Sequence, residues 1–235
     1  MIPDSALNIW EHTKNSLYPL YEKRTAGLAE EMDCHAQAAE IYAPFCSRDD
    51  RILDAAGGSG YFYWSLARRG LLGRYHLSDQ TADFIEIAKR HLPANLDGGS
   101  FIIAPIQQTP GQYQAVFCLN ALFCLPDYRQ GLERLLSSTK KIIIIRTALA
   151  DKTEIRYESD DYLDPGAENL RAYFNIWKFE EVAEFISSYH FNVFTVTDSR
   201  TQDQPEISAG KIFPWRWLIG ISGDIKTPDN FRRVV

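Results

Sequence analysis

Short apolar runs alternate along the chain with segments whose apolar residues recur at helical spacing. This alternation is typical of a parallel sheet whose strands are joined by helices. The last run holds four consecutive isoleucines, Ile142–Ile145, and a run that is apolar on both faces favours a central strand covered by helices. Together the runs predict strands at residues 51–55, 74–78, 100–106, 115–119 and 141–146.

The segments between these runs carry helix start and stop signals. Thr81 is placed to cap a helix over residues 82–91. The N-terminal residues 5–46 have helical spacing that Pro19 and Gly27 interrupt, which predicts two or more helices there. The same reasoning predicts helices at residues 61–69, from Asp127 onward, and at 179–189.

The pattern changes after Thr147. Residues 148–172 are charged and irregular, and predicted strands at 191–197 and 212–221 are joined by the polar loop 199–210. Two late strands with no helix between them predict antiparallel pairing at one edge of the sheet. The predicted fold class is therefore α/β, with a Rossmann-like, doubly wound, seven-stranded sheet. It is mainly parallel, has an antiparallel C-terminal hairpin strand, and carries helices on both faces.

Composition and charge narrow the class of protein. A chain of 235 residues is long enough for one domain with a full core. The net charge of −6 argues against a nucleic-acid partner held through its phosphates. The four cysteines form no CxxC pair, the N-terminus lacks a signal-peptide pattern, and no apolar run is long enough to span a bilayer. We expect a cytoplasmic protein without a membrane partner, and a homodimer is compatible with these features.

A glycine turn follows the first predicted strand. That strand ends on Asp54, and Gly57, Gly58 and Gly60 come directly before the helix at 61–69. The order strand, glycine turn, helix allows the backbone to approach a nucleotide-like ligand. A Cβ atom at the turn would block the ligand or forbid the backbone conformation, which is why glycine is needed.

With its flanking motifs, this turn resembles that of the class I S-adenosylmethionine-dependent methyltransferases. Their acid-x-Gly-x-Gly-x-Gly turn corresponds to Asp54–Gly60 here, and their acid after strand two corresponds to Asp79. An apolar-Asn-x-Leu-x-x-Leu-x-Asp segment that often follows strand four corresponds to Leu119–Asp127. The resemblance covers roughly residues 50–222, which is most of one domain.

The resemblance implies S-adenosylmethionine as cofactor and S-adenosylhomocysteine as product. It implies that the glycine turn touches the methionine part and that Asp79 accepts hydrogen bonds from the ribose hydroxyls. Asp54 would hold the turn or reach the cofactor's amino group through water, and Leu119 and Asn120 would flank the methionyl side. The full set of predicted cofactor contacts is Asp54, Ala56, Gly57, Gly58, Ser59, Gly60, Asp79, Gln80, Ile106, Gln107, Leu119, Asn120, Tyr18 and Tyr21.

The chain departs from the family pattern at two places. Ala56 stands where the family has its first glycine. The family often carries an acid after strand three that binds the adenine amino group, and Pro105 occupies that region here. Proline offers neither a side-chain acceptor nor an N–H. Gln107 or Gln108 would then supply an amide, and Ile106 would pack on the adenine ring.

The acceptor side carries no motif of its own. We divide the chain into an N-terminal helical lid, 1–48, and a Rossmann-like methyltransferase domain, 49–235, with a second lid inserted near 147–177. The acceptor is expected between the lids as a small or medium-sized molecule, methylated on oxygen or nitrogen. The aromatic rim favours a natural-product, sugar or lipid-like compound. Candidate acceptor contacts are Asn120, Phe123, Tyr157, Tyr173 and Asn175.

Two histidines are candidates for a general base. A hydroxyl acceptor would need one, and His12 and His35 lie in the segment that faces the substrate. A neutral amine or a carbanion would need no strong base. No metal site is predicted, because no cluster of ligands surrounds Asp160 and Asp161.

Other interpretations of the same residues stay open. The glycine turn suits a Rossmann-like protein with another ligand, although an NAD-type turn prefers the looser Gly-x-Gly-x-x-Gly spacing. Asp79 suits a helix-capping role before Thr81. The missing strand-three acid motivates a catalytically inactive binding or scaffold protein. A nucleotide-dependent oxidoreductase or epimerase is a further alternative.

Overall fold

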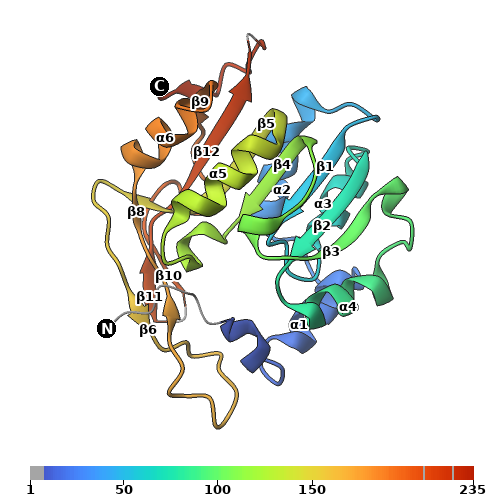
Figure 1. The fold of residues 1–235 in the computed structure, drawn as a ribbon, viewed down its shortest axis with the longest axis vertical. Coiled ribbons are helices and arrows are strands. Elements are labelled where there is room, and N and C mark those ends of the chain that lie inside the picture. The colour runs from blue at the N-terminus through green and yellow to red at the C-terminus, as the bar shows by residue number, and fades with distance from the viewer. Residues whose placement is uncertain (1–7, 209, 224) are drawn as a thin grey trace.

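A single mixed sheet with helices on both sides forms the centre of the protein in a computed structural model (Figure 1). The structure describes residues 8–208, 210–223 and 225–235. The strand order is β13-β9-β12-β5-β4-β1-β2-β3, and β8 pairs with β5. The strands are β1 (Arg51–Ala55), β2 (Arg74–Asp79), β3 (Ser100–Ile103), β4 (Tyr113–Leu119), β5 (Thr139–Ala150), β8 (Trp177–Lys178), β9 (Phe191–Thr195), β12 (Trp215–Ser222) and β13 (Arg232–Arg233).

The pairing directions confirm the expected topology. Strands β1 to β5 pair in parallel, and β12 runs antiparallel to both β5 and β9. The sheet has nine strands, where the sequence led us to expect seven. The added strands β8 and β13 are two residues long. A pair of residues is too short to show an alternating pattern, so no sequence signal marks them.

Helices cover both faces of the sheet and bury two cores. The helices are α1 (Tyr18–Thr25), α2 (Asp33–Tyr42), α3 (Phe62–Arg68), α4 (Ala82–His91), α5 (Tyr128–Ser138) and α6 (Phe179–Ser187). Buried residues of α2, α3 and α4 pack on one face, and those of α5 and α6 pack on the other. The isoleucines of β5 face both cores alternately, as a doubly covered central strand requires. No described helix has the length and apolar character to cross a membrane.

Several boundaries differ from the sequence-based expectation. Pro19 lies in the first turn of α1, where a missing N–H breaks no helical bond, and does not interrupt the helix. The third strand ends at Ile103 rather than 106, because Pro105 cannot donate to the ladder and residues Ile106–Gln108 wind into a 3₁₀ turn. Residues 148–172 and 199–210 contribute short strands, which form two hairpins. These are β6 (Tyr157–Glu158) with β7 (Ala172–Tyr173), and β10 (Glu206–Ser208) with β11 (Lys211–Phe213).

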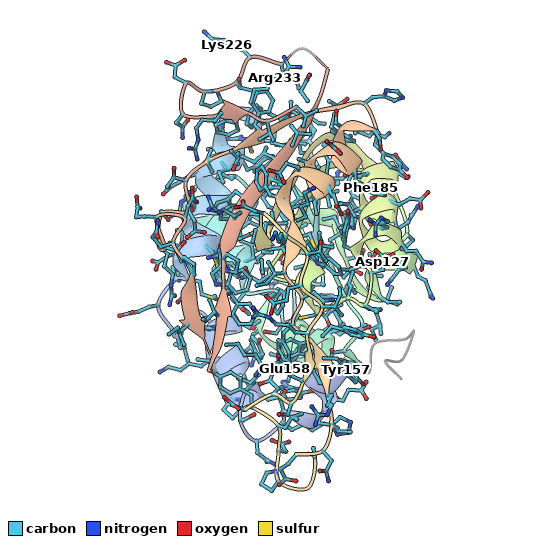
Figure 2. The ribbon with its side chains drawn as sticks, turned by 90° about the vertical axis from the view of Figure 1, so that its left-hand side faces the viewer. Asp127, Tyr157, Glu158, Phe185, Lys226 and Arg233 are labelled. Atoms are coloured by element: carbon cyan, nitrogen blue, oxygen red, sulfur yellow. The ribbon has the colours of Figure 1, made fainter. Side chains whose placement is uncertain are left out.

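The hairpins and the N-terminal helix lie beyond the carboxyl ends of the parallel strands (Figure 1). Tyr157 and Glu158 of β6 lie toward the opposite end of the molecule from Lys226 and Arg233 (Figure 2). Residues 8–32 and 151–174, which we call the two covering segments, touch each other, because the backbone N–H of Asp164 donates to the carbonyl of His12 at 2.8 Å. The edge where parallel strands end is where open α/β sheets bind ligands.

Candidate functional site

A cavity of about 1050 Å³ opens at the carboxyl edge of the sheet. Its lining comes from the turns after β1, β3 and β4, from the ends of β2 and β5, and from both covering segments. Ligand pockets of drug-sized molecules occupy roughly 300–1,000 Å³. The cavity therefore has room for more than one small ligand.

The glycine turn after β1 has the backbone that its sequence predicts. Gly58 (φ 57°) and Gly60 (φ 77°) adopt left-handed conformations. A Cβ atom added at Gly57 would lie 2.4 Å from the carboxyl group of Asp54, a distance that only glycine avoids. Ala56 also has a left-handed backbone, with φ 51°. The alanine thus occupies a position that favours glycine, as the family pattern has it.

Asp79 ties the glycine turn to the end of β2. Its Oδ2 atom accepts the backbone N–H of Gly58 at 2.9 Å, and its Oδ1 atom accepts that of Thr81 at 2.8 Å. Burial raises the pKa of Asp79, and these hydrogen bonds oppose the rise. Each carboxylate oxygen has a second lone pair, and Asp79 lines the cavity. The carboxylate can therefore hold the turn and still accept bonds from a ligand.

The sequence predicted that the Thr81 side chain caps helix α4, and this prediction is wrong. Thr81 occupies the N-cap position of α4, but its hydroxyl makes no capping hydrogen bond. The hydroxyl instead donates to Asn8 Oδ1 at 3.4 Å. The backbone N–H of Thr81 is instead bonded by the Asp79 carboxylate, as in the alternative that places Asp79 before the helix.

Asp54 is a second buried acid below the turn. The Tyr75 hydroxyl donates a hydrogen bond to its carboxylate. Burial raises the pKa of Asp54 to about 7, with the Tyr75 bond opposing the rise and the charge of Asp79 adding to it. A carboxyl group with this pKa changes its charge near neutral pH. Asp54 also lines the cavity, so a cation bound there would favour its ionised form.

The expected adenine side is built from neutral groups. Gln80, Ile106, Gln107 and Gln108 all line the cavity, and Tyr21 lines it from helix α1. The Tyr21 ring packs edge-on against Phe84 at 4.8 Å between centroids. This arrangement offers amide groups and apolar surface in place of an acid.

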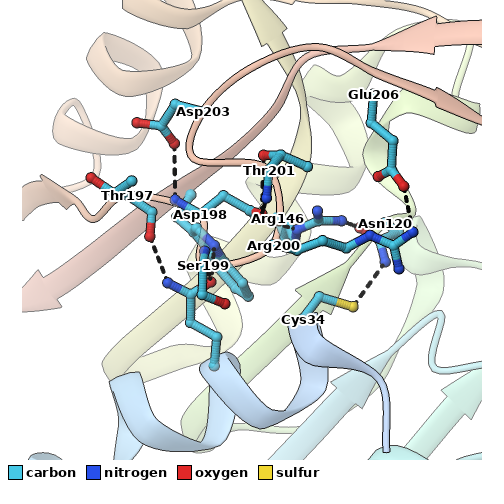
Figure 3. Close-up of polar contacts among 12 residues, drawn as sticks. Cys34, Asn120, Arg146, Thr197, Asp198, Ser199, Arg200, Thr201, Asp203 and Glu206 are labelled. Atoms are coloured by element: carbon cyan, nitrogen blue, oxygen red, sulfur yellow. Dashed lines mark hydrogen bonds and ion pairs between the residues drawn. The ribbon is translucent and has the colours of Figure 1, made fainter.

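Asn120 lines the cavity and joins the end of β4 to β5 through hydrogen bonds. Its backbone is left-handed (φ 57°), and its N–H donates to the carbonyl of Arg146 at 2.8 Å. The side-chain Oδ1 accepts from Arg146 Nη1 at 2.7 Å, and Nδ2 lies 3.7 Å from the Cys34 Sγ atom (Figure 3). Leu119 and Asn120 both line the cavity, and their place beside the methionyl part of a cofactor stays a prediction.

Four aromatic side chains line another part of the cavity, which we call the chamber. Phe213 stacks on Trp215 at 4.9 Å, and Phe123 packs edge-on against both rings at 5.4 and 5.3 Å. Phe174 lies 6.3 Å from Phe123. We call Phe123, Phe174, Phe213 and Trp215 the aromatic wall. The four rings are largely buried against one another, and the atoms that they present to the cavity are apolar.

The predicted acceptor contacts divide into two groups. Phe123 and Tyr173 line the cavity with Asn120, whereas Tyr157 and Asn175 do not. Asn175 is fully buried and donates from Nδ2 to the carbonyl of Leu125 at 2.8 Å. Tyr157 packs against Tyr173 at 4.9 Å. Tyr157 and Asn175 therefore contact residues that line the cavity but do not line it themselves, and the sequence does not distinguish the two groups.

Three of the predicted cofactor contacts also lie behind the cavity surface. Ser59 is buried and accepts a hydrogen bond from the Thr25 hydroxyl at 2.6 Å. Gly60 packs against Leu77, whose Cδ2 atom would lie 2.8 Å from an added Cβ. Tyr18 turns its hydroxyl to Asp83 at 3.4 Å. None of these three residues lines the cavity.

The two candidate bases are placed differently. His35 lines the cavity, is buried, and stacks on Tyr61 at 4.8 Å between ring centroids. Burial, together with the charge of Arg24, lowers the pKa of His35 to about 3, so its imidazole is neutral. His12 does not line the cavity. Its carbonyl takes part in the contact between the two covering segments.

Sequence reasoning missed several residues that line the cavity. They are Arg24, Cys34, Arg146, Arg200, Lys211, Phe213 and Trp215. These residues come from separate elements and belong to no local motif, so no spacing could have joined them. Among the described residues there is no group of three or more His, Cys, Asp or Glu side chains that could hold a metal ion.

Solved structures of other proteins have a similar fold, although no sequence comparison found a relative. No family model and no curated protein sequence matched the chain. Magnesium protoporphyrin IX methyltransferase from Synechocystis, solved with S-adenosylmethionine, has a TM-score of 0.59 at 16% identity and covers 94% of this chain and 100% of its own.

Two further solved structures are similar to the same extent. The 1,6-didemethyltoxoflavin-N1-methyltransferase of Burkholderia thailandensis, solved with S-adenosylhomocysteine, has a TM-score of 0.60 at 18% identity, covering 95% and 93%. An S-adenosylmethionine-dependent methyltransferase of Clostridium acetobutylicum has a TM-score of 0.58 at 11% identity, covering 89% and 98%. The chain therefore has the fold of the class I S-adenosylmethionine-dependent methyltransferases.

Proposed function

We propose that this protein transfers a methyl group from S-adenosylmethionine to a small-molecule acceptor. The observation that carries the proposal is the Asp79 carboxylate, which holds the N–H of Gly58 and faces the cavity. A strand-end acid joined to a glycine turn suits a nucleoside whose ribose bonds the acid and whose amino-acid part lies on the turn. Structural neighbours solved with S-adenosylmethionine or S-adenosylhomocysteine support the same ligand.

The residues present fit this cofactor. Asp79 would hold the ribose, the Ala56–Gly58 backbone and Asp54 would hold the methionyl end, and Ile106 with Gln107 would meet the adenine. Asp54 and Asp79 lie at the end of the cavity that would receive a cationic cofactor, and the positive charge of that cofactor would favour their ionised forms.

When bound, the cofactor supplies an activated methyl group on a sulfonium that is already a good leaving group. The protein's part is then to align the acceptor and exclude water, and alignment can account for roughly 7–11 kcal/mol of a barrier. The aromatic wall and the two covering segments provide that enclosure. His35 lines the same cavity, but its lowered pKa makes the imidazole a weak proton acceptor, which favours a methyl acceptor that needs no strong base, such as a neutral amine.

Calorimetric titration tests the proposal. S-adenosylhomocysteine is expected to bind with a dissociation constant on the order of micromolar, and NADH is expected not to compete. Undetectable binding at millimolar S-adenosylhomocysteine would contradict the proposal and favour a scaffold protein. Displacement by NADH would favour a nucleotide-dependent oxidoreductase or epimerase.

A further inference from the structure

Arg146 is a buried cation on the floor of the chamber. It follows the isoleucine run of β5, and its side chain is 4% exposed. An arginine in such a position is costly unless its charge is paired and its N–H groups have partners. Arg146 nonetheless lines the cavity. The residue therefore needs an explanation beyond packing.

The protein satisfies only part of this guanidinium. Nε donates to Asp198 Oδ2 at 2.7 Å, and Nη1 donates to Asn120 Oδ1 at 2.7 Å (Figure 3). A guanidinium has five N–H donors, and no hydrogen bond from Nη2 is found within the described part of the chain. Since Arg146 faces the cavity, these remaining donors are available to a ligand.

The two bonded partners hold the guanidinium in one orientation. Asp198 is 1% exposed, and its Oδ1 atom accepts the N–H of Thr201 at 3.0 Å. Burial would raise the pKa of Asp198, but the hydrogen bond and charge of Arg146 outweigh it and lower the pKa. Asn120 is fixed in turn by its backbone bond to Arg146. A donor fixed in this way loses little freedom when it binds a ligand.

The same guanidinium forms one end of the aromatic wall. Its central carbon lies 4.8 Å from the Trp215 ring centroid, and Trp215 stacks on Phe213 with planes 20° apart. At the other end Lys211 lies 4.6 Å over the Phe174 ring. Lys211 has no carboxylate within salt-bridge distance among the described residues. A flat surface with a buried cation at one end is complementary to a flat ligand with an acidic oxygen.

We propose that the methyl acceptor is an aromatic acid whose ring packs on the aromatic wall and whose carboxylate is bound by Arg146. This inference rests on the proposed function, because it names the acceptor of that same site. A cationic acceptor would meet Arg146 and Lys211 as like charges. A neutral acceptor would leave the Nη2 donors of a buried guanidinium unsatisfied, which is a penalty that specificity can exploit.

The test compares two ligands that differ only in the acidic group. Protein saturated with S-adenosylhomocysteine is titrated by calorimetry with 6-hydroxy-2-naphthoate and with its neutral carboxamide. The acid is expected to bind at least about tenfold more tightly, as charge-assisted bonds to a guanidinium are stronger than neutral ones. Equal binding of the two ligands, or binding of neither, would overturn the inference.

Two variants assign the preference to Arg146. R146K keeps a positive charge for Asp198 but removes the planar fork, and it is expected to lower the preference to about twofold or less in protein that still binds S-adenosylhomocysteine. K211M removes the cation at the other end of the wall and is expected to lower the preference less than R146K does. Loss of the preference in K211M would overturn the assignment to Arg146, even if R146K fails to fold.

The outcomes also separate the two proposals. If wild-type protein binds S-adenosylhomocysteine but does not distinguish acid from amide, the proposed function stands and the acceptor class is wrong. If S-adenosylhomocysteine does not bind at all, the proposed function itself fails.

Discussion

The two ends of the cavity are built in different ways. The end near the glycine turn is made of backbone and of acids from neighbouring strand ends, with Asp54 and Asp79 as its polar groups. The chamber at the other end is made of side chains from β5, β11, β12 and both covering segments. The first end is fixed by hydrogen bonds within two short stretches of sequence. The second depends on the whole chain being folded.

Because the two ends are built differently, a single mutation is expected to affect one end and not the other. A change of Asp79 at the glycine-turn end removes a hydrogen bond that holds the turn and, with it, the proposed contact to a ligand. A change in the chamber leaves the turn intact, since none of the contacts of Gly58 or Asp79 reaches the aromatic wall. The predictions below use that separation.

The largest effect is expected from D79A. The substitution removes the acceptor for the N–H groups of Gly58 and Thr81 as well as the proposed ribose contact. Affinity for S-adenosylhomocysteine, measured by calorimetry, should fall about 100-fold, or about 2.7 kcal/mol. E86A, which removes an exposed acid of α4 paired with Lys89, is the matched control and should bind normally. Unchanged affinity in D79A would remove this residue from the site.

The next effect is expected from G57A. The new Cβ would collide with the Asp54 carboxyl group, so the turn must shift. The free energy of unfolding should fall by about 2 kcal/mol, as for other overpacked sites, and S-adenosylhomocysteine binding should weaken with it. G70A is the control, because a Cβ there meets no atom within 4 Å and only the left-handed backbone opposes it. If G57A and wild type bind S-adenosylhomocysteine with equal affinity, the glycine turn does not contact this ligand.

The pKa of Asp54 predicts a pH dependence of stability. The folded value of about 7 lies above the ordinary value of 3.8. The folded state therefore holds a proton that the unfolded state has released, and this contribution to stability is lost as pH rises through 7. The wild-type free energy of unfolding should fall relative to D54N between about pH 4 and 7, by at most about 1.4 kcal/mol per pH unit. If the free energy of unfolding changes with pH by the same amount in wild type and D54N, the pKa of Asp54 is not raised.

A smaller effect, of opposite sign, is expected from A56G. Ala56 adopts φ 51°, which glycine reaches without steric cost. The substitution should raise the free energy of unfolding by up to about 1 kcal/mol in chemical denaturation. It should leave S-adenosylhomocysteine affinity within about twofold of wild type, because the turn keeps its shape. A loss of stability would mean that the Ala56 methyl group contributes packing that outweighs the strain.

The smallest effect is expected from D164A. The Asp164 carboxylate accepts the N–H of Asn15 at 2.9 Å in an exposed contact between the covering segments. Its loss should cost less than about 1 kcal/mol. Hydrogen exchange of the Asn15 amide should nevertheless become faster, while D151A, a control on the same segment, leaves it unchanged. Identical exchange in D164A would show that this contact does not hold the segments together.

The sequence predicted the cofactor end better than the chamber for a physical reason. Asp54, Gly57 and Asp79 lie at strand ends, where local pattern fixes both the backbone and the direction of the side chain. Arg146 gave no such signal, because a single arginine after four isoleucines carries no spacing that points to Asp198 or Asn120. Their meeting depends on tertiary contacts across 26 and 52 residues of sequence.

The sequence pattern also gave a wrong prediction where a residue lies in the glycine turn but its side chain points away from the cavity. Ser59 belongs to the glycine turn, yet its hydroxyl faces Thr25 and not the cavity. The strands β8 and β13 form only because longer neighbours offer them free edges. Pro105 has two effects. It stands in the region where the family often has an acid, and it ends β3 at Ile103, earlier than the sequence predicted.

A crystal structure of the protein with S-adenosylhomocysteine tests the central claim most directly. The account predicts both ribose hydroxyls within hydrogen-bond distance of Asp79, the amino-acid end against Gly57 and Gly58, and the sulfur directed toward the aromatic wall. A nucleoside bound elsewhere, or a ribose that makes no contact with Asp79, would contradict it.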